Sequence, residues 1–371
     1  MKRLAVIGNG LAISASASFE MLPLTTAVRA ELGTINGGVL LQRLEDAGRL
    51  LVPANFHPDR NFEHLLGPFD RLTLLLRGPL LGLVGAASAQ RAALAAAATE
   101  VDRLYVRGVG AVLGRIDAPA VPVVIAPVRA VVNWITAGLG ADNEASIYTV
   151  NYDALLDQEL LEAQRNSHGA LRLDDEFAPL GGTATVTLPL PGAPSLHLIG
   201  LRPPQLLRPG NLHLFHLHGA LQWVEYSGET WKVKEINELR VNHVFDHWRD
   251  GKILPVRPRL ILTDQKDRAV GLDPFASDYT ALRTDLAAAD RVLIAGYGFG
   301  DVPLNDELAR AWRNRAPAAR WLIVCGRTNP VVRNLRALEI ARALRTHIFA
   351  MPTISWRGLP WVTGAVPLFW T

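Results

Sequence analysis

Short runs of apolar residues recur at the start of the chain and through its second half, each bounded by glycine or polar residues. Continuous apolar runs of this kind are typical of strands covered on both faces, as in a parallel sheet flanked by helices. We interpret the following segments as strands: 4–7, 146–150, 212–217, 260–263, 292–295 and 321–324. The pattern therefore predicts an α/β protein built on a doubly wound parallel sheet.

The pattern changes between about 40 and 142, where Leu and Ala recur at helical spacing without a comparable strand pattern. We interpret this region as a helical insertion. Residues 171–210 are rich in Gly, Pro and Thr, which predicts a long excursion between two strands. In a single domain over 1–371, we expect the core at about 1–39, 143–170 and 211–350, and an aromatic tail at about 351–371.

Composition narrows the class of protein. With 49% hydrophobic and 20% charged residues, the chain is expected to fold rather than to be disordered. Lys and Arg number 38 against 35 Asp and Glu, and no basic cluster stands out, so we expect no direct nucleic-acid binding. Arg and Pro residues break the apolar stretches, so we expect no membrane-spanning helix.

Cys325 is the only cysteine, which excludes an internal disulfide framework and a zinc site built from cysteines. The N-terminus has some features of a signal peptide. However, Gly8 and Gly10 interrupt its apolar stretch after a few residues, as expected for a strand that runs into a tight loop. We therefore expect a cytoplasmic protein.

The first motif, Gly8-Asn9-Gly10, follows the first predicted strand and precedes a predicted helix. Glycines allow the backbone to approach a diphosphate, and the N-terminus of the following helix presents N–H groups to it. The dinucleotide-binding fingerprint has a third glycine at the position of Ile13, so the match is incomplete. A diphosphate-binding loop and a plain strand-to-helix turn are both compatible with this motif.

The second motif places Asn151 and Asp153 directly after the strand predicted at 146–150. In open α/β sheets, ligands bind beyond the carboxyl ends of the strands, where these side chains are expected. The amide of Asn151 can hold a sugar hydroxyl or a water without adding charge beside a cationic intermediate. For Asp153, contact with a ligand and a cap at the start of the next helix are both compatible with the sequence.

The third motif brings three histidines together over 213–218. Histidine is suited to proton transfer near neutral pH, and His218 is best placed to reach a pocket because it stands next to a glycine at the strand end. We interpret His216 as a core histidine with its own hydrogen-bond partners. A metal site that also uses His243 and His247 is the less favoured alternative, because no acidic residue completes a familiar metallohydrolase spacing.

The fourth motif, over 296–305, follows the strand predicted at 292–295 and contains three glycines that alternate with aromatic residues. Such glycines permit close backbone approach to a ligand, while Asp301 and Asn305 offer polar partners for ribose hydroxyls. A tight structural turn with buried aromatic side chains is the alternative interpretation.

In this order, the four motifs resemble the sirtuin-like superfamily, specifically its bacterial zinc-less branch associated with anti-phage defence. The motifs are Gly8-Asn9-Gly10, Thr149-x-Asn151-Tyr152-Asp153, Leu217-His218-Gly219 and Gly296-Tyr297-x-Phe299-x-Asp301-x-x-Leu304-Asn305. A weaker similarity covers Asn61-Phe62-Glu63, which is similar to a helix start frequent in such proteins. The resemblance extends over most of the chain, but the matching residues are concentrated in the four motifs.

The resemblance implies a Rossmann-like domain that takes NAD as its substrate, uses no metal, and hydrolyses NAD to nicotinamide and ADP-ribose. Asn151 and His218 match the positions of the family's catalytic pair. By this resemblance, His218 acts as general base toward a hydroxyl of the nicotinamide ribose, and Asn151 holds that ribose or the attacking water. The residues implied to bind NAD are Gly8, Asn9, Gly10, Ser14, Asp153, Gly296, Tyr297, Gly298, Phe299, Asp301 and Asn305.

The chain also departs from the family pattern. Ala12 occupies the position of a serine in the first loop, with Ser14 two residues beyond, and Gly298 occupies the position of a serine in the last motif. Deacylating sirtuins carry a four-cysteine zinc module and a Pro-Asp-Phe-Arg stretch, and this sequence has neither. We therefore do not expect protein deacylation.

For the biological role, the resemblance implies an NAD glycohydrolase that depletes NAD in anti-phage defence by abortive infection. Relatives in defence are commonly silenced by oligomerisation or by a partner. We therefore expect a homo-oligomer, regulated by a partner such as a HerA-like ATPase or an Argonaute-type protein. The alternative is a non-catalytic subunit that binds NAD or ADP-ribose, or that scaffolds a defence assembly.

Overall fold

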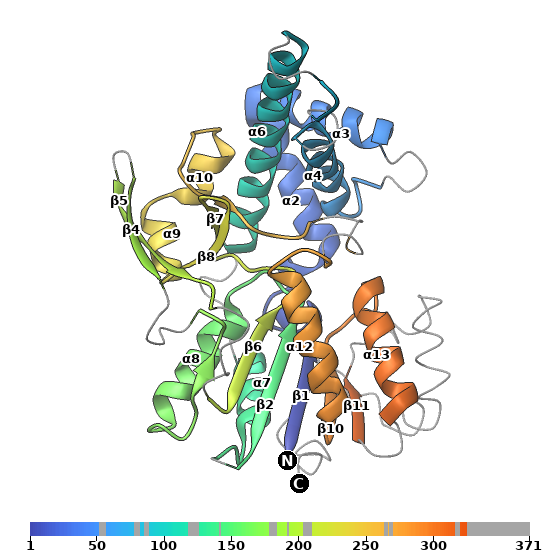
Figure 1. Cartoon of the computed structure of the whole chain (residues 1–371), viewed down its shortest axis with the longest axis vertical. Coiled ribbons are helices and arrows are strands. Elements are labelled where there is room, and N and C mark those ends of the chain that lie inside the picture. The colour runs from blue at the N-terminus through green and yellow to red at the C-terminus, as the bar shows by residue number, and fades with distance from the viewer. Residues whose placement is uncertain are drawn as a thin grey trace.

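The computed structural model shows a parallel sheet with its flanking helices and, beyond one edge of that sheet, a second group of helices and strands (Figure 1). Cys325, Thr263 and the tail predicted at 351–371 lie outside the described residues. The structure describes residues 1–51, 57–77, 82–84, 89–117, 126–140, 142–177, 184–190, 193–202, 210–262, 266, 270–315 and 320–324.

The six-stranded sheet has the order β11-β10-β1-β2-β6-β3, and all its strands are parallel. The strands are β1 (Lys2–Ile7), β2 (Glu144–Thr149), β3 (Leu173–Asp174), β6 (Leu212–His216), β10 (Arg291–Ala295) and β11 (Arg320–Val324). The chain leaves the central strand β1 toward β2 on one side and returns to β10 on its other side. The doubly wound parallel sheet predicted from the apolar runs is therefore confirmed.

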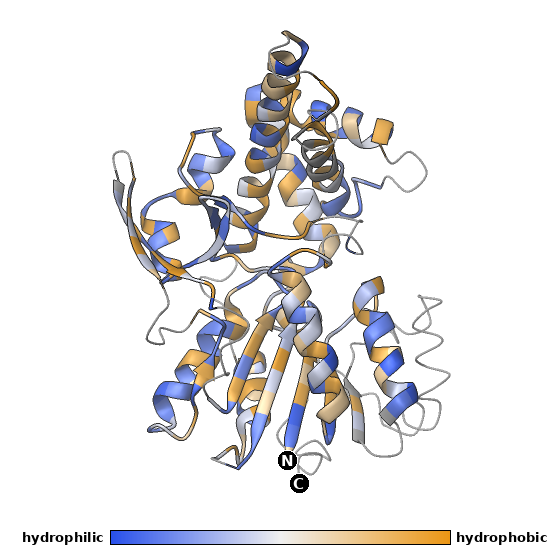
Figure 2. Ribbon diagram, in the orientation of Figure 1, coloured by the Kyte–Doolittle hydropathy of each residue, from blue (hydrophilic) through white to orange (hydrophobic). Residues whose placement is uncertain are grey.

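Helices cover both faces of this sheet. Leu4 and Val6 of β1 face a core shared with α12 and α13, whereas Ala5 and Ile7 face a core shared with α7 and α8. Because successive strand residues point to opposite faces, a continuous apolar run can fill both cores. Figure 2 shows hydrophilic residues on α8 and α13, which form the outer layers. The bounds are α7 (Ala126–Thr136), α8 (Leu155–Asn166), α12 (Phe275–Ala288) and α13 (Val302–Arg315).

A helical layer lies beyond the carboxyl edge of the sheet, at the top of Figure 1. It contains α2 (Met21–Thr34), α3 (Val39–Leu51), α4 (Glu63–Arg77), α6 (Ala89–Asp117) and α10 (Val244–Arg249). The short elements α1 (Gly10–Ala15), η1 (Ala17–Phe19) and η2 (Ile35–Gly38) connect to it. In α6, charged residues such as Glu100, Asp102 and Arg103 interrupt the apolar positions. None of the helices in the described ranges is long and apolar enough to cross a bilayer.

A second sheet takes two strands from the region predicted as an excursion and three from the region after 211 that was predicted as core. It is antiparallel, with the order β4-β5-β8-β7-β9, and α9 (Ile236–Val241) packs beside β5 and β8. Its strands are β4 (Thr185–Leu190), β5 (Ala193–Gly200), β7 (Trp223–Tyr226), β8 (Glu229–Val233) and β9 (Arg257–Pro258). The apolar runs did not predict this sheet because a half-exposed strand such as β4 alternates polar and apolar positions.

The strand predicted at 260–263 is wrong over its described part. Leu260, Ile261 and Leu262 are buried but irregular. The Ile261 N–H donates to His218 O at 3.0 Å, and Ile261 O accepts from the Tyr152 hydroxyl at 2.6 Å. These backbone groups therefore bond to the loops after β6 and β2 instead of to a sheet ladder, which places the segment beside the candidate site.

Candidate functional site

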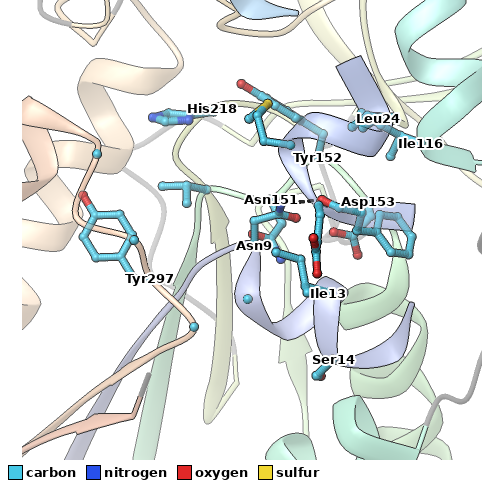
Figure 3. Close-up of a pocket in the computed structure, with 18 of the residues that line it drawn as sticks. Asn9, Ile13, Ser14, Leu24, Ile116, Asn151, Tyr152, Asp153, His218 and Tyr297 are labelled. Carbon is cyan, nitrogen blue, oxygen red and sulfur yellow. Dashed lines mark hydrogen bonds between the residues drawn. The ribbon is translucent and has the colours of Figure 1, made fainter. Parts of the chain in front are cut away.

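A cavity of about 1100 Å³ lies at the carboxyl ends of β1, β2, β6 and β10. The loops that follow these strands form one wall, and residues of α2, α4 and α6 form the other. β1 lies where the chain order of the sheet reverses, and ligands of open α/β sheets bind in the crevice at such a point. Figure 3 shows Asn9, Asn151 and Asp153 close together, with His218 and Tyr297 to one side and Ser14 apart from them.

Three predicted glycines serve to pack two loops against each other. A Cβ on Gly8 would lie 2.5 Å from Tyr297 Cα, and one on Gly10 would lie 2.7 Å from Gly296 Cα. Gly296 itself adopts φ 63°, a conformation that favours glycine. The N–H groups of Gly8 and Gly10 donate to the carbonyls of Ala295 and Gly296. The loop packing accounts for these glycines without a ligand, and those two N–H groups are already used.

The side chains of the first loop are also partly engaged. Asn9 Nδ2 donates to Phe19 O at 2.8 Å, which ties the loop to η1. The Ser14 hydroxyl donates to Leu11 O at 2.6 Å within α1. Both residues line the cavity, and so does Gly10. Ala12, which stands where the family has a serine, is buried in the core.

Asn151 contributes the most conspicuous polar group of the cavity wall. Its backbone N–H donates to Thr149 Oγ1 at 3.1 Å, which fixes the turn at the end of β2. The residue is 4% exposed, and its Oδ1 is buried without a hydrogen-bond partner among the described residues. A buried acceptor without a donor is costly, so this oxygen is suited to receive a hydrogen bond from a ligand.

Asp153 accepts a hydrogen bond at the start of α8 and also lies at the cavity, so its contact with a ligand stays a prediction. Its Oδ1 accepts from the Leu155 N–H at 3.1 Å, at the start of α8, and the residue also lines the cavity. Burial raises the pKa of Asp153 to about 6, and the nearby Asp157 carboxylate adds to the increase. The carboxyl group therefore titrates close to neutral pH.

His218 follows β6 and lines the cavity although only 2% of it is exposed. Its Nε2 lies 2.7 Å from Asp301 Oδ2. Gly219, the next residue, has φ 81°, and a Cβ there would lie 2.4 Å from Arg259 O. Only glycine fits this position, so the chain can turn sharply and leave His218 at the wall.

The last glycine segment divides into residues that line the cavity and residues that support them. Gly296, Tyr297, Gly298 and Asp301 line it, whereas Phe299 and Asn305 do not. Asn305 Nδ2 donates to Phe299 O at 3.0 Å, and the Tyr297 hydroxyl donates to Asn305 Oδ1 at 3.0 Å. Because these groups bond to each other, we assign Asn305 and Phe299, like Gly8, to holding the loops and not to contact with a ligand.

Three residues absent from the predicted site also line the cavity: Glu63, Tyr152 and Lys266. The Tyr152 hydroxyl lies 3.1 Å from Glu63 Oε1, and Lys266 Nζ lies 3.8 Å from Glu63 Oε2. Burial lowers the pKa of Lys266, but Glu63 and Asp301 outweigh burial and raise it, so its ammonium group is charged. The Asn61-Phe62-Glu63 similarity was a signal for Glu63, whereas no pattern in the sequence pointed to Lys266.

The two other histidines of the third motif lie outside this cavity. His216 is buried, with Nε2 at 3.2 Å from Asp157 Oδ1 and Nδ1 at 3.4 Å from Asn151 O. His213 Nδ1 lies 3.4 Å from Asp174 Oδ2. No group of three or more potential metal ligands occurs among the residues that the structure describes.

Comparison with known families adds one finding. The model of the SIR2-like domain matches residues 145–341, which is more than half of the chain. The match covers the Asn151, His218 and Gly296 motifs and leaves out β1 and the helical layer before α7. No curated protein matches the chain significantly.

Proposed function

Since the chain belongs to the family of SIR2-like domains, we propose that it hydrolyses NAD to nicotinamide and ADP-ribose. SIR2-like domains are in general NAD-dependent enzymes. The observation that carries the proposal is the buried Oδ1 of Asn151, which has no partner among the described residues. A ribose hydroxyl or a water molecule supplies the donor that this oxygen needs.

The reaction replaces one bond at the ribose. The bond between C1′ and the nicotinamide nitrogen breaks, and the nicotinamide leaves as a neutral base with the electron pair. Water adds to the cationic sugar and releases a proton, so the products are nicotinamide, ADP-ribose and one proton. In this scheme His218 accepts a proton from a hydroxyl of the nicotinamide ribose, and Asn151 holds that ribose or the water.

The charges of the cavity suit a cation that develops at the sugar. Four residues with carboxyl groups line the cavity, against Lys266 and His218: Glu20, Glu63, Asp153 and Asp301. Fixed negative charge in a cavity of low dielectric stabilises a developing positive charge. Apolar residues such as Leu24, Phe62 and Ile116 also line the cavity and suit a neutral aromatic leaving group.

Chromatography of the nucleotide products tests the proposal. We expect the purified protein, alone or with the partner that activates it, to convert NAD to nicotinamide and ADP-ribose. In the Asn151→Ala variant we expect turnover to fall by about 10²-fold or more, because the ribose or water loses its position. Binding of NAD without turnover by the parent protein under both conditions would favour the non-catalytic alternative.

We further propose that this activity depletes NAD during phage infection, in a homo-oligomer silenced by a regulatory partner. An unregulated NAD hydrolase would harm its own cell, which is the physical reason to expect such control. A HerA-like ATPase or an Argonaute-type protein is the kind of partner that we expect. Cellular NAD measured during infection, with the parent gene and with the Asn151→Ala gene, tests the role. Sedimentation of the purified protein tests the oligomer.

A further inference from the structure

Asp301 presents two oxygens that have different surroundings. Its Oδ1 accepts from the Leu304 N–H at 2.9 Å, which caps the start of α13, and lies 3.5 Å from the Tyr279 hydroxyl. Its backbone carbonyl accepts from the Asn305 N–H at 3.0 Å and lies 3.0 Å from the Tyr297 hydroxyl. Oδ1 and the backbone carbonyl are therefore bonded to the loop and to the start of α13. These contacts fix the carboxylate in one orientation.

Oδ2 of the same carboxylate faces the cavity residues instead. It lies 2.7 Å from His218 Nε2 and 3.5 Å from Lys266 Nζ. Neither Oδ2 nor Nε2 makes an aligned hydrogen bond to any described residue, so the close contact between them is the main interaction of each. Both residues are at most 3% exposed, so water does not screen the pair.

We propose that Asp301 is a positioning residue for His218: it binds the Nε2 edge of the imidazole and leaves Nδ1 to accept the proton from the substrate. This inference rests on the proposed hydrolysis of NAD and replaces the ribose contact that the sequence suggested for Asp301. A carboxylate beside an imidazole orients the ring, selects its tautomer and stabilises the imidazolium that forms when the ring accepts a proton. The fixed orientation of Asp301 makes it suited to this role.

The charges around the pair agree with this role. Burial alone would raise the pKa of Asp301, but the charges of His218 and Lys266 outweigh burial and hold the pKa well below its usual range. Burial, followed by nearby carboxylates, raises the pKa values of Tyr152, Tyr279 and Tyr297 well above the usual value. Glu63 approaches the pair only through Lys266. The tyrosines and Lys266 therefore keep their protons between pH 5 and 9, and Asp301 stays ionised.

The test is Asp301→Asn with Asp246→Asn as the matched control. Asparagine caps a helix about as well as aspartate, so the Leu304 contact is retained, while an amide NH2 replaces Oδ2 and cannot accept a hydrogen bond from the imidazole N–H. We expect kcat to fall by about 10²-fold or more with KM nearly unchanged, and the acidic limb of the pH–rate profile to move to lower pH. Asp246→Asn makes the same change beside His243, an exposed histidine outside the cavity, and should keep the parental kcat and profile.

The substitution leaves the other titratable groups nearby, such as Asp153 and His216, unchanged, so the difference between the two profiles reports the His218 pair. A parental kcat and profile in Asp301→Asn would overturn the proposal. A raised KM with parental kcat would also overturn it, because that result identifies Asp301 as a ribose ligand. If Asp301→Asn does not fold, Asp301→Ser retains a capping oxygen and takes its place.

A measurement without substrate separates failure of this inference from failure of the proposed function. NMR titration of the histidine rings in the protein without NAD reports the pH at which the His218 ring loses its proton. In Asp301→Asn we expect that pH to fall by about 1 unit, because the imidazolium then faces a neutral amide. An unchanged titration would exclude the pair even if NAD is hydrolysed. A lowered titration would retain the pair even if NAD is not the substrate.

Discussion

Two histidines that stand two residues apart carry the same kinds of charged neighbours. One set, the inner cluster, consists of His216, Asp157 and Lys232. His216 Nε2 lies 3.2 Å from Asp157 Oδ1, and Lys232 Nζ lies 3.7 Å from the same oxygen. Burial raises the pKa of Asp157, but the charges of His216 and Lys232 outweigh burial and lower it to about 2.

The other set, the cavity cluster, consists of His218, Asp301 and Lys266. Here His218 Nε2 lies 2.7 Å from Asp301 Oδ2, and Lys266 Nζ lies 3.5 Å from the same oxygen. The two clusters differ in what the second ring nitrogen meets. His216 Nδ1 lies 3.4 Å from Asn151 O, whereas His218 Nδ1 has no hydrogen bond to a described residue, and His218 lines the cavity.

The comparison shows that residue type and charge pairing do not separate a catalytic histidine from a structural one. An imidazole with a buried carboxylate beside it is suited to proton transfer only when its other nitrogen can reach a ligand. The inner cluster has both nitrogens occupied and supports the loop that carries Asn151. We therefore expect substitutions in the two clusters to affect different quantities, namely turnover for the cavity cluster and stability for the inner one.

The largest expected effect is on turnover, from His218→Ala. We expect kcat for NAD hydrolysis to fall by about 10²-fold or more, because the proton acceptor is removed. Product chromatography measures turnover, and thermal unfolding gives the folded fraction to which the turnover is referred. His243→Ala is the control, because His243 is a histidine with a 71% exposed side chain outside the cavity. Full activity in His218→Ala would remove the proposed mechanism.

The next effect is on stability, from Asp157→Asn in the inner cluster. Removing this carboxylate leaves the buried charges of Lys232 and His216 less compensated, so we expect the free energy of unfolding to fall by about 3 kcal/mol at pH 7. The ionised Asp157 stabilises the fold above the pKa of the unfolded state, near 4, and this contribution is lost as pH falls toward 2. The difference between parent and variant should therefore shrink between pH 4 and pH 2.

Urea unfolding at several pH values measures this difference. The surface pair of His243 and Asp246, 3.3 Å apart with exposed side chains, provides the matched control Asp246→Asn, for which we expect a loss below about 1 kcal/mol. Turnover per folded Asp157→Asn molecule should stay within about tenfold of the parent. A collapse of turnover at parental stability would contradict the division between the two clusters.

The strands of the parallel sheet could be predicted from the sequence because they are buried. The apolar runs identified β1, β2, β6 and β10 because strands buried on both faces are rich in apolar residues. The same signal misassigned Leu260 to Leu262, which are equally buried but bond to the loops of the site. A run of apolar residues indicates that a segment is buried. Whether the segment also pairs as a strand depends on the part of the chain that lies beside it.

The candidate site was predictable only in part for a similar reason. The rule that ligands bind beyond strand ends placed Asn151 and His218 at one edge of the sheet, and both line the cavity. The contacts of Asp301 with His218 and Lys266 join segments that are far apart in the chain and carry no common spacing. Such contacts depend on tertiary packing, so the sequence suggested a different role for Asp301.

The smallest of the three effects is expected at Asp153, which lies between the cavity and the inner cluster. Here we expect the substitution to raise the free energy of unfolding, whereas Asp157→Asn lowers it. Burial raises its pKa to about 6, so the folded protein holds the proton more tightly than the unfolded chain. The ionised carboxylate therefore destabilises the fold, by at most about 3 kcal/mol, with the penalty growing between pH 4 and pH 6 and complete above that range. Asp153→Asn keeps the oxygen that accepts from the Leu155 N–H and removes the charge.

We expect Asp153→Asn to raise the free energy of unfolding by about 1–3 kcal/mol at pH 7.5, and parent and variant to converge near pH 4. Thermal unfolding at several pH values measures this difference. The same variant should bind NAD less tightly if the carboxylate contacts the substrate, so a gain in stability would coincide with a higher KM. A variant less stable than the parent at pH 7.5 would contradict this prediction. It would mean that the ionised Asp153 stabilises the fold, as the Asp157 carboxylate of the inner cluster does.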